Sequence, residues 1–185
     1  AYATDFLIEA QRAGVPVPQQ AVDRALSAMR QISQPTGWVS ISYRTEYPEW
    51  WAGSPEASKK ATETMRSRAS AYALYVLAKG GRGDLGRLRW WNDVQMKSEK
   101  SPLAKAQVGA GLALMGDHAR ARSALRQAIA GLGYREDSDW YQSRLRDLAG
   151  VIALAYEAGG WSYSLALVLG MLAVMAIIVA RFWKQ

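Results

Sequence analysis

The chain has 185 residues and a formal net charge of +7, and half of its residues are hydrophobic. This length allows one domain with a sizeable core and a short appendage, and this hydrophobic content excludes a disordered chain. Because the sequence contains no cysteine, disulfide bonds, thiolate metal sites and a cysteine nucleophile are excluded.

The N-terminal segment predicts a helical hairpin. One helix is expected over residues 2–13, where Gly14 suits the left-handed conformation that ends a helix, and a second over residues 19–32. Residues 15–18, Val-Pro-Val-Pro, form an extended connector, because a residue that precedes proline is disfavoured in helical geometry. The apolar stripes of the two helices are Phe6, Leu7 and Ala10, and Val22, Ala25, Leu26 and Met29. Since the chain starts with Ala1 inside the first predicted helix, without a signal peptide, we expect it to be either a processed chain or part of a longer protein.

Residues 33–64 break the helical pattern. Prolines and glycines are too dense there for a long helix: Pro35, Gly37, Pro48, Gly53 and Pro55. Val39, Ile41 and Tyr43 alternate as in a strand, so we predict a long irregular excursion that can hold a short β-hairpin. Its aromatic residues are Trp38, Tyr43, Tyr47, Trp50 and Trp51. They fit either exposed rings that bind a sugar or a protein partner, or rings that anchor the loop to the helical body, and we favour anchoring.

The helical pattern resumes at Arg66 and ends at Gly80-Gly81, and Asp84 can cap a shorter helix that follows. The expected buried residues are Ala69, Tyr72, Ala73, Val76 and Leu77 in the longer helix, and Leu85, Leu88 and Trp91 in the shorter one.

Residues 101–131 predict a second hairpin most clearly. Ser101 and Pro102 form a helix start, and Gly116 suits a left-handed helix end before Asp117, which can cap the next helix. The stripes are Leu103, Ala106, Ala110, Ala113 and Leu114, then Ala121, Ala124, Leu125, Ala128 and Ile129. The many alanines allow the two helices to pack closely.

A loop over residues 131–138 precedes a final helix over residues 141–158, which ends at Gly159-Gly160. Its predicted stripe is Leu145, Leu148, Ile152 and Tyr156.

The last residues, 160–185, differ in composition from the rest of the chain. Residues 162–180 contain no charge over 19 positions, about 28 Å of helix, which is close to the thickness of a membrane's hydrocarbon core. Trp161, Tyr163 and Trp183 bracket this stretch, and Arg181 and Lys184 follow it. We therefore predict two units, a helical domain over residues 1–159 and a single transmembrane helix with a basic tail over residues 160–185. The charges after the span favour a domain outside the cytoplasm. A complete chain without a signal would instead leave the domain in the cytoplasm.

The sequence predicts no catalytic, cofactor-binding or metal-binding residue, and we expect no enzyme activity. His118 is the only histidine and is expected on the surface, and Glu136, Asp137 and Asp139 lack the spacing of a calcium-binding loop. The sequence contains no glycine-rich phosphate loop, no G-x-S-x-G and no H-E-x-x-H.

The basic excess, concentrated between residues 59 and 135, fits either nucleic-acid binding or a solvated helical surface. Its arginines are spread over separate predicted helices: Arg82, Arg87, Arg89, Arg120, Arg122 and Arg126. No known nucleic-acid motif accompanies them, so we expect no nucleic-acid partner.

Four segments, taken in order, resemble the thioester domain of bacterial α2-macroglobulins. They are ATDFLIEAQRAGVPVP, RASAYALYVLAKGGRGDLGRLRWWND, SPLAKAQVGAGLALMGDHARARSALRQAI and YQSRLRDLAGVIALAYEAG. The resemblance covers about residues 1–159 and implies an α/α toroid like that of terpenoid cyclases, of which this chain would supply the latter, incomplete part. The family's thioester motif, C-x-E-Q, would lie upstream of Ala1, so no site residue is transferred to this chain.

The resemblance implies a non-enzymatic part of a broad-range protease inhibitor, a protease trap at the bacterial inner membrane, with its helical domain in the periplasm. Its partners would be proteases, the membrane and the remaining domains of the parent protein, without a cofactor or a small-molecule substrate. The transmembrane tail departs from the family pattern, in which β-sandwich domains normally follow the toroid.

Two alternatives belong to other classes. Residues 113–129 look like one tetratricopeptide-type repeat, which would suit a membrane-anchored scaffold that binds a protein partner. No 34-residue period recurs, however, and the excursion at residues 33–64 would interrupt a solenoid. A small subunit of a membrane complex is the other alternative.

Overall fold

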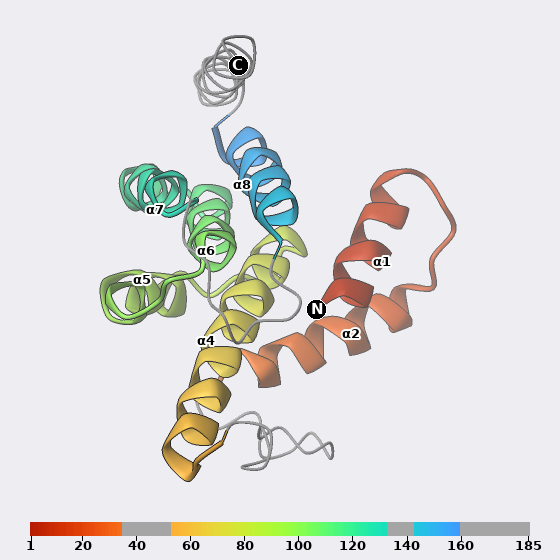
Figure 1. Ribbon diagram of the computed structural model, residues 1–185. Helices are drawn as coiled ribbons and strands as arrows, with labels where there is room; N and C mark the ends of the chain where they lie inside the picture. The colour runs from red at the N-terminus through yellow and green to blue at the C-terminus, as the bar shows by residue number, and fades with distance from the viewer. Residues whose placement is uncertain (35–52, 133–142, 160–185) are drawn as a thin grey trace, which may run out of the picture.

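The structure is a computed structural model that describes residues 1–34, 53–132 and 143–159 (Figure 1). Over these ranges the chain forms seven α-helices and one short 3-10 helix, with no strand. The elements are α1 (Tyr2–Arg12), α2 (Gln19–Ile32), α4 (Pro55–Lys79), α5 (Leu85–Asp93), η2 (Gln95–Lys97), α6 (Pro102–Leu114), α7 (His118–Ala130) and α8 (Arg144–Gly159). The predicted all-helical class is thus confirmed for this part of the chain.

Several predictions fall outside the described residues. These are the β-hairpin and the aromatic group at residues 38–51, the acidic residues 136–139 and the transmembrane span 162–180. Within the described ranges, no helix combines the length and the apolar character that crossing a membrane requires.

The helix ends follow the predicted capping chemistry. The Ser101 side chain accepts a hydrogen bond from the Ala104 amide at the start of α6, and the Asp117 carboxylate accepts one from the Arg120 amide at the start of α7. Between these helices Gly116 has φ +84°, a left-handed conformation that glycine adopts without a steric penalty. The hairpin at residues 101–131 is therefore confirmed.

The predicted start of the third described helix was wrong. Helix α4 begins at Pro55, not at Arg66, and so includes the last ten residues of the predicted excursion. Ser54 accepts a hydrogen bond from the Ala57 amide, and Pro55 occupies the first turn, where its missing amide costs nothing. The Ser-Pro pair is a helix start here, as it is at Ser101.

Three predicted stripes were wrong in part, and the one in α6 fails only at Leu114, which is 39% exposed. Phe6 is 71% exposed in α1, where the buried positions are Thr4 and Ile8. In α8 the buried apolar residues are Val151, Leu154 and Ala155. Leu145 and Tyr156 of the predicted stripe are 76% and 51% exposed. Helices α1 and α8 carry apolar residues on more than one face, so periodicity alone does not select the face that packs.

Helix α6 lies at the centre of the described structure and packs against α4, α5, α7 and α8 (Figure 1). Helix α2 packs against α4, so α2, α4, α6 and α8 form a continuous row, while α5 and α7 contact each other beside it. The core divides into two clusters, and α4 and α6 contribute to both. The largest fully buried side chains include Trp91, Leu74, Leu77, Leu88 and Leu112.

Small residues permit this central position. Ten residues of α6 are buried, and six of them are alanine or glycine. A Cβ atom at Gly109 would lie 3.0 Å from Cγ of Leu125 and 3.3 Å from the carbonyl oxygen of Ala121, both in α7. The α6–α7 contact therefore depends on the absence of a side chain at this position.

We expect Gly109→Val to lower the free energy of unfolding by about 1–3 kcal/mol, because the added methyl groups overpack the contact with α7. Urea unfolding followed by circular dichroism measures this change. The matched control is Gly86→Val in α5, where an added Cβ meets nothing closer than 3.4 Å. An equal loss in both variants would contradict close packing at Gly109.

Candidate functional site

A cleft of about 590 Å³ lies where the end of α2, the first half of α4, α5 and η2 meet. Its lining includes Ser33 from the end of α2, Lys60 and Thr64 from α4, Trp90 from α5 and Ser98 beyond η2. This volume lies within the range of about 300–1,000 Å³ that is usual for ligand sites. The cleft is the candidate binding site of the described structure.

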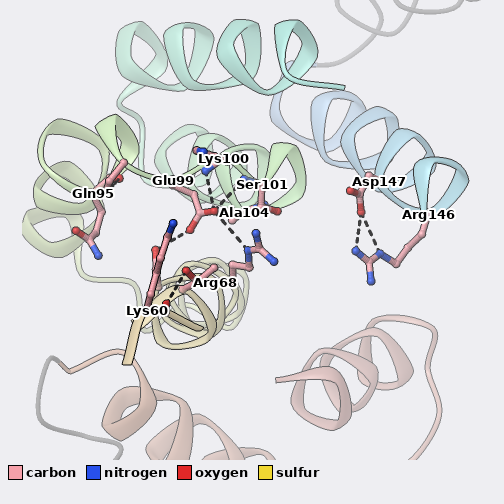
Figure 2. Close-up of polar contacts among 12 residues, drawn as sticks. Lys60, Arg68, Gln95, Glu99, Lys100, Ser101, Ala104, Arg146 and Asp147 are labelled. Carbon is pink, nitrogen blue, oxygen red and sulfur yellow. Dashed lines mark hydrogen bonds and ion pairs between the residues drawn. The ribbon is translucent and has the colours of Figure 1, made fainter. Parts of the chain in front are cut away.

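A buried carboxylate forms one wall of the cleft. The Glu99 side chain is only 3% exposed, and each of its oxygens accepts at least one hydrogen bond (Figure 2). Oε2 accepts from the Ser67 hydroxyl at 2.8 Å. Oε1 accepts from Nε of Arg68 at 3.4 Å and from the backbone amides of Lys100 and Ser101 at 2.9 and 2.8 Å. A charge with this many donors is retained in a protein interior, and here it ties α4 to the turn before α6.

The remaining charged lining of the cleft is mainly positive. Lys60, Arg66, Arg68 and Lys100 carry four positive charges, and Glu63 is the second carboxylate beside Glu99. Trp90 is 50% exposed, and Trp91 is 1% exposed. The Trp91 indole N–H is buried and has no hydrogen-bond partner in the described structure.

A second polar group joins α1, α4 and α8. Nζ of Lys79 lies 2.7 Å from a carboxylate oxygen of Asp5 and 2.8 Å from one of Glu9, and its side chain is 7% exposed. The Tyr72 hydroxyl donates to Asp5 at 3.0 Å, and the Tyr75 hydroxyl donates to Glu157. These contacts fasten both end helices to α4.

The electrostatics of this second group argue against nucleophilic chemistry. Burial lowers the pKa of Lys79, but the hydrogen bonds that its ammonium donates to Asp5 and Glu9 outweigh burial and raise the pKa above its usual value. Burial raises the pKa of Tyr72 and of Tyr75, and their hydrogen bonds to carboxylates raise these pKa values further. Lys79 and both tyrosines therefore stay protonated at neutral pH, and the group acts as a structural tie.

The residues singled out in the sequence do not converge on a site. His118 is exposed at the first position of α7, and the described ranges hold no group of three histidine or acidic residues placed to bind a metal. Several arginines form ion pairs instead. They are Arg82 with Asp23 at 2.6 Å, Arg89 with Asp117 at 2.7 Å, and Arg120 with Asp93 at 3.2 Å.

Sequence reasoning missed both Glu99 and Lys79. Glu99 reaches Arg68 across 31 positions of the chain, and Lys79 reaches Asp5 across 74. The available signal was weak in each case: a single glutamate before the Ser-Pro helix start, and a lysine at the end of an apolar helix.

We expect Glu99→Ala to lower the free energy of unfolding by about 3 kcal/mol or more, because it removes the buried acceptor that Arg68, Ser67 and two backbone amides share. Chemical unfolding of the full chain measures this. Glu63→Ala is the control, since Glu63 is an exposed glutamate in the same cleft, and we expect a change within about 0.5 kcal/mol. Equal effects of the two substitutions would show that Glu99 is not a structural tie.

Comparison with known proteins agrees with the family resemblance of the four sequence segments. An alpha-2-macroglobulin of Escherichia coli strain K12 is 32% identical to this chain over 161 residues, which is 85% of the chain and 9% of that protein. Alpha-2-macroglobulins of Xylella fastidiosa strains Temecula1 and 9a5c are each 27% identical over 160 residues, with the same shares. No protein-family model matches the chain, and no solved structure matches it.

The relatives are thus much longer than the matched stretch, and the chain spans about 9% of their length. All three carry the same name, and the match extends over most of this chain. The resemblance stated from the residues is confirmed: the chain belongs to the bacterial alpha-2-macroglobulin family and corresponds to one segment of its members.

Proposed function

We propose that this chain supplies the latter part of the helical toroid of a thioester domain, and that it supports a protease trap without performing chemistry itself. Three relatives named alpha-2-macroglobulin support the family context. The row α2, α4, α6 and α8, with α5 and α7 beside it, is the arrangement expected of part of an α/α ring.

The observation that carries the proposal is the exposed apolar stripe on α8. Leu145 and Tyr156 are 76% and 51% exposed on the face where the sequence predicts burial, while Ile152 between them is partly buried and packs against the core. On α1, Tyr2 and Phe6 are 78% and 71% exposed. Apolar side chains grouped in this way mark surfaces that contact another part of a protein. Further helices of the parent toroid would cover the α8 stripe.

The role proposed here is structural. The chain holds no cysteine, so the thioester that would link a protease covalently has to lie in another part of the parent protein. The helical body would hold and shield that group. We further propose that the whole protein inhibits proteases in the periplasm and is associated with the inner membrane.

A tetratricopeptide-type scaffold is supported less well. The helices of the row contain 14, 25, 13 and 16 residues, whereas a solenoid is built from repeats of nearly constant length.

We expect Leu145→Asp to impair the full-length protein that contains this segment. A charged side chain in the buried α8 contact would cost roughly 3 kcal/mol or more. The measurement is the amount of added trypsin retained in a complex that resists denaturing electrophoresis, together with the melting temperature of the full-length protein. Both should fall.

The matched control is Ser123→Asp, which adds the same charge at an exposed position of α7. In the 185-residue chain alone, both substitutions should leave the free energy of unfolding within about 0.5 kcal/mol, because neither side chain is buried there. If Leu145→Asp is as harmless as Ser123→Asp in the full-length protein, no helix covers the α8 stripe and the proposal fails.

A further inference from the structure

We propose that residues 1–13 form a detachable N-terminal arm, which undocks from α4 as a unit while the other described helices stay folded. The arm consists of α1 with one residue on either side. Three features carry the inference: the small apolar contact of α1, the polar groups that hold it, and the connector that follows it. The inference does not depend on the protease-trap function.

Helix α1 places little of its surface in the core. It lies at the edge of the described helices, where it packs against α2 and α4 (Figure 1). Its buried residues are Thr4 and Ile8, whereas ten residues of α6 are buried. Ala1 and Leu7 pack against the core only in part. Segments with few buried apolar contacts open at a lower free energy than the core does, so α1 is the helix expected to leave first.

Polar contacts supply much of what holds the arm to the end of α4. Nζ of Lys79 lies 2.7 Å from a carboxylate oxygen of Asp5 and 2.8 Å from one of Glu9. The Tyr72 hydroxyl donates to Asp5 at 3.0 Å, and the Arg12 guanidinium donates to the Lys79 backbone carbonyl at 3.0 Å. Three charged side chains of the arm therefore contact one short stretch of α4.

Water can replace these polar contacts. Glu9 and Arg12 are exposed and Asp5 is partly buried, so the charges of the arm are already near solvent. A hydrogen bond from Lys79 lowers the pKa of Glu9 below its ordinary value, so Glu9 is ionised at neutral pH. When the arm leaves, both sets of charges regain hydration, which offsets much of the attraction that is lost. Undocking thus leaves no charge buried without a partner.

The connector behind the arm provides a hinge. Gly14 has φ +79°, and a Cβ atom there would meet nothing within 4 Å. Glycine changes its backbone angles easily, whereas the prolines of the Val-Pro-Val-Pro stretch at residues 15–18 restrict theirs. One exposed hydrogen bond, from Gln11 to Gln19 at 3.0 Å, spans the connector, and water can replace it. Rotation at Gly14 would therefore move α1 as one body.

Undocking would uncover an apolar surface at the end of α4. A Cβ atom at Gly80 would lie 3.3 Å from Cδ1 of Ile8 and 2.7 Å from Cδ2 of Leu26, so Ile8 covers Gly80 beside α2. This surface would become accessible without any change in α6. The arm is thus a conformational device that covers and exposes one apolar site.

Hydrogen-deuterium exchange of the 185-residue chain, measured by mass spectrometry in urea below the unfolding transition, tests the proposal. An isolated helix of 11 residues is marginal in water, so α1 amides lose their protection when the arm undocks. We expect them to be protected about 100-fold less than the amides of α6. Because undocking exposes little surface, the exchange of α1 should depend weakly on urea, whereas that of α6 should rise steeply.

Lys79→Met should speed the exchange of α1 about tenfold or more, because it removes the cation of α4 that Asp5 and Glu9 share. Asp5→Asn keeps the shape of the side chain and removes its charge, so it should act in the same direction. It also tests the contact if Lys79→Met does not fold. The double variant should add little to either single change, because each breaks the same contact.

Arg82→Met is the matched control. Arg82 lies three positions after Lys79 and pairs with Asp23 of α2 at 2.6 Å, so its removal changes the net charge equally. We expect the exchange of α1 to stay within about twofold of the unchanged chain, since an exposed ion pair contributes little. Circular dichroism of every variant checks that it remains folded.

Three results would overturn the proposal. The first is exchange of α1 and α6 with equal protection and equal urea dependence, because α1 would then open only when the whole domain unfolds. The second is an acceleration of α1 by Arg82→Met that equals that by Lys79→Met. The third is an acceleration by Lys79→Met or Asp5→Asn that is as large in α6 as in α1.

Discussion

The close approach of helices to α6 is the constraint on which the described fold depends. Gly109 faces α7, and a Cβ atom at Gly111 would lie 2.9 Å from Cδ2 of Leu88 in α5. On the opposite side, a Cβ atom at Gly150 of α8 would lie 2.6 Å from Cδ1 of Leu103 in α6. Glycines of α6 and α8 thus set the spacing between α6 and its neighbours α5, α7 and α8. Because these contacts are tight, α6 is covered on nearly all sides, and α4 and α8 are placed by it.

Two groups of hydrogen bonds and ion pairs connect helices of this packed row to neighbouring segments. Glu99 joins the middle of α4 to the turn before α6, and Lys79 joins the end of α4 to α1. Two surfaces are not explained by the packing of the described residues. They are the apolar stripe of α8 and the cleft beside η2. We propose that further helices of the parent protein cover the first of these surfaces.

Local chemistry made much of this fold predictable. The bounds of α2 match the prediction at both ends, and the capping residues Ser101, Asp117 and Asp84 act as their sequence context indicates. These features depend on neighbours within four positions, which a sequence displays directly. The family was also predictable, because the resemblance rests on the order of whole segments.

Features set by distant contacts were not predictable. The start of α4 was missed because prolines and glycines before it were weighed as breaks, although Pro55 begins a helix. The wrong face of α8 was chosen because the helix is apolar on two faces, and packing against α6 decides between them. The cleft joins residues from Ile32 to Lys100, and no local pattern indicates that they meet.

The central claim is that this row of helices is one part of the ring in a protease trap. Reading the coding sequence upstream of Ala1 tests it most directly. The account predicts an open reading frame that continues upstream and encodes a C-x-E-Q motif in further helical segments. A start codon at or near Ala1, followed by one continuous gene through residue 185, would contradict it, because the α8 stripe would then have no ring to complete.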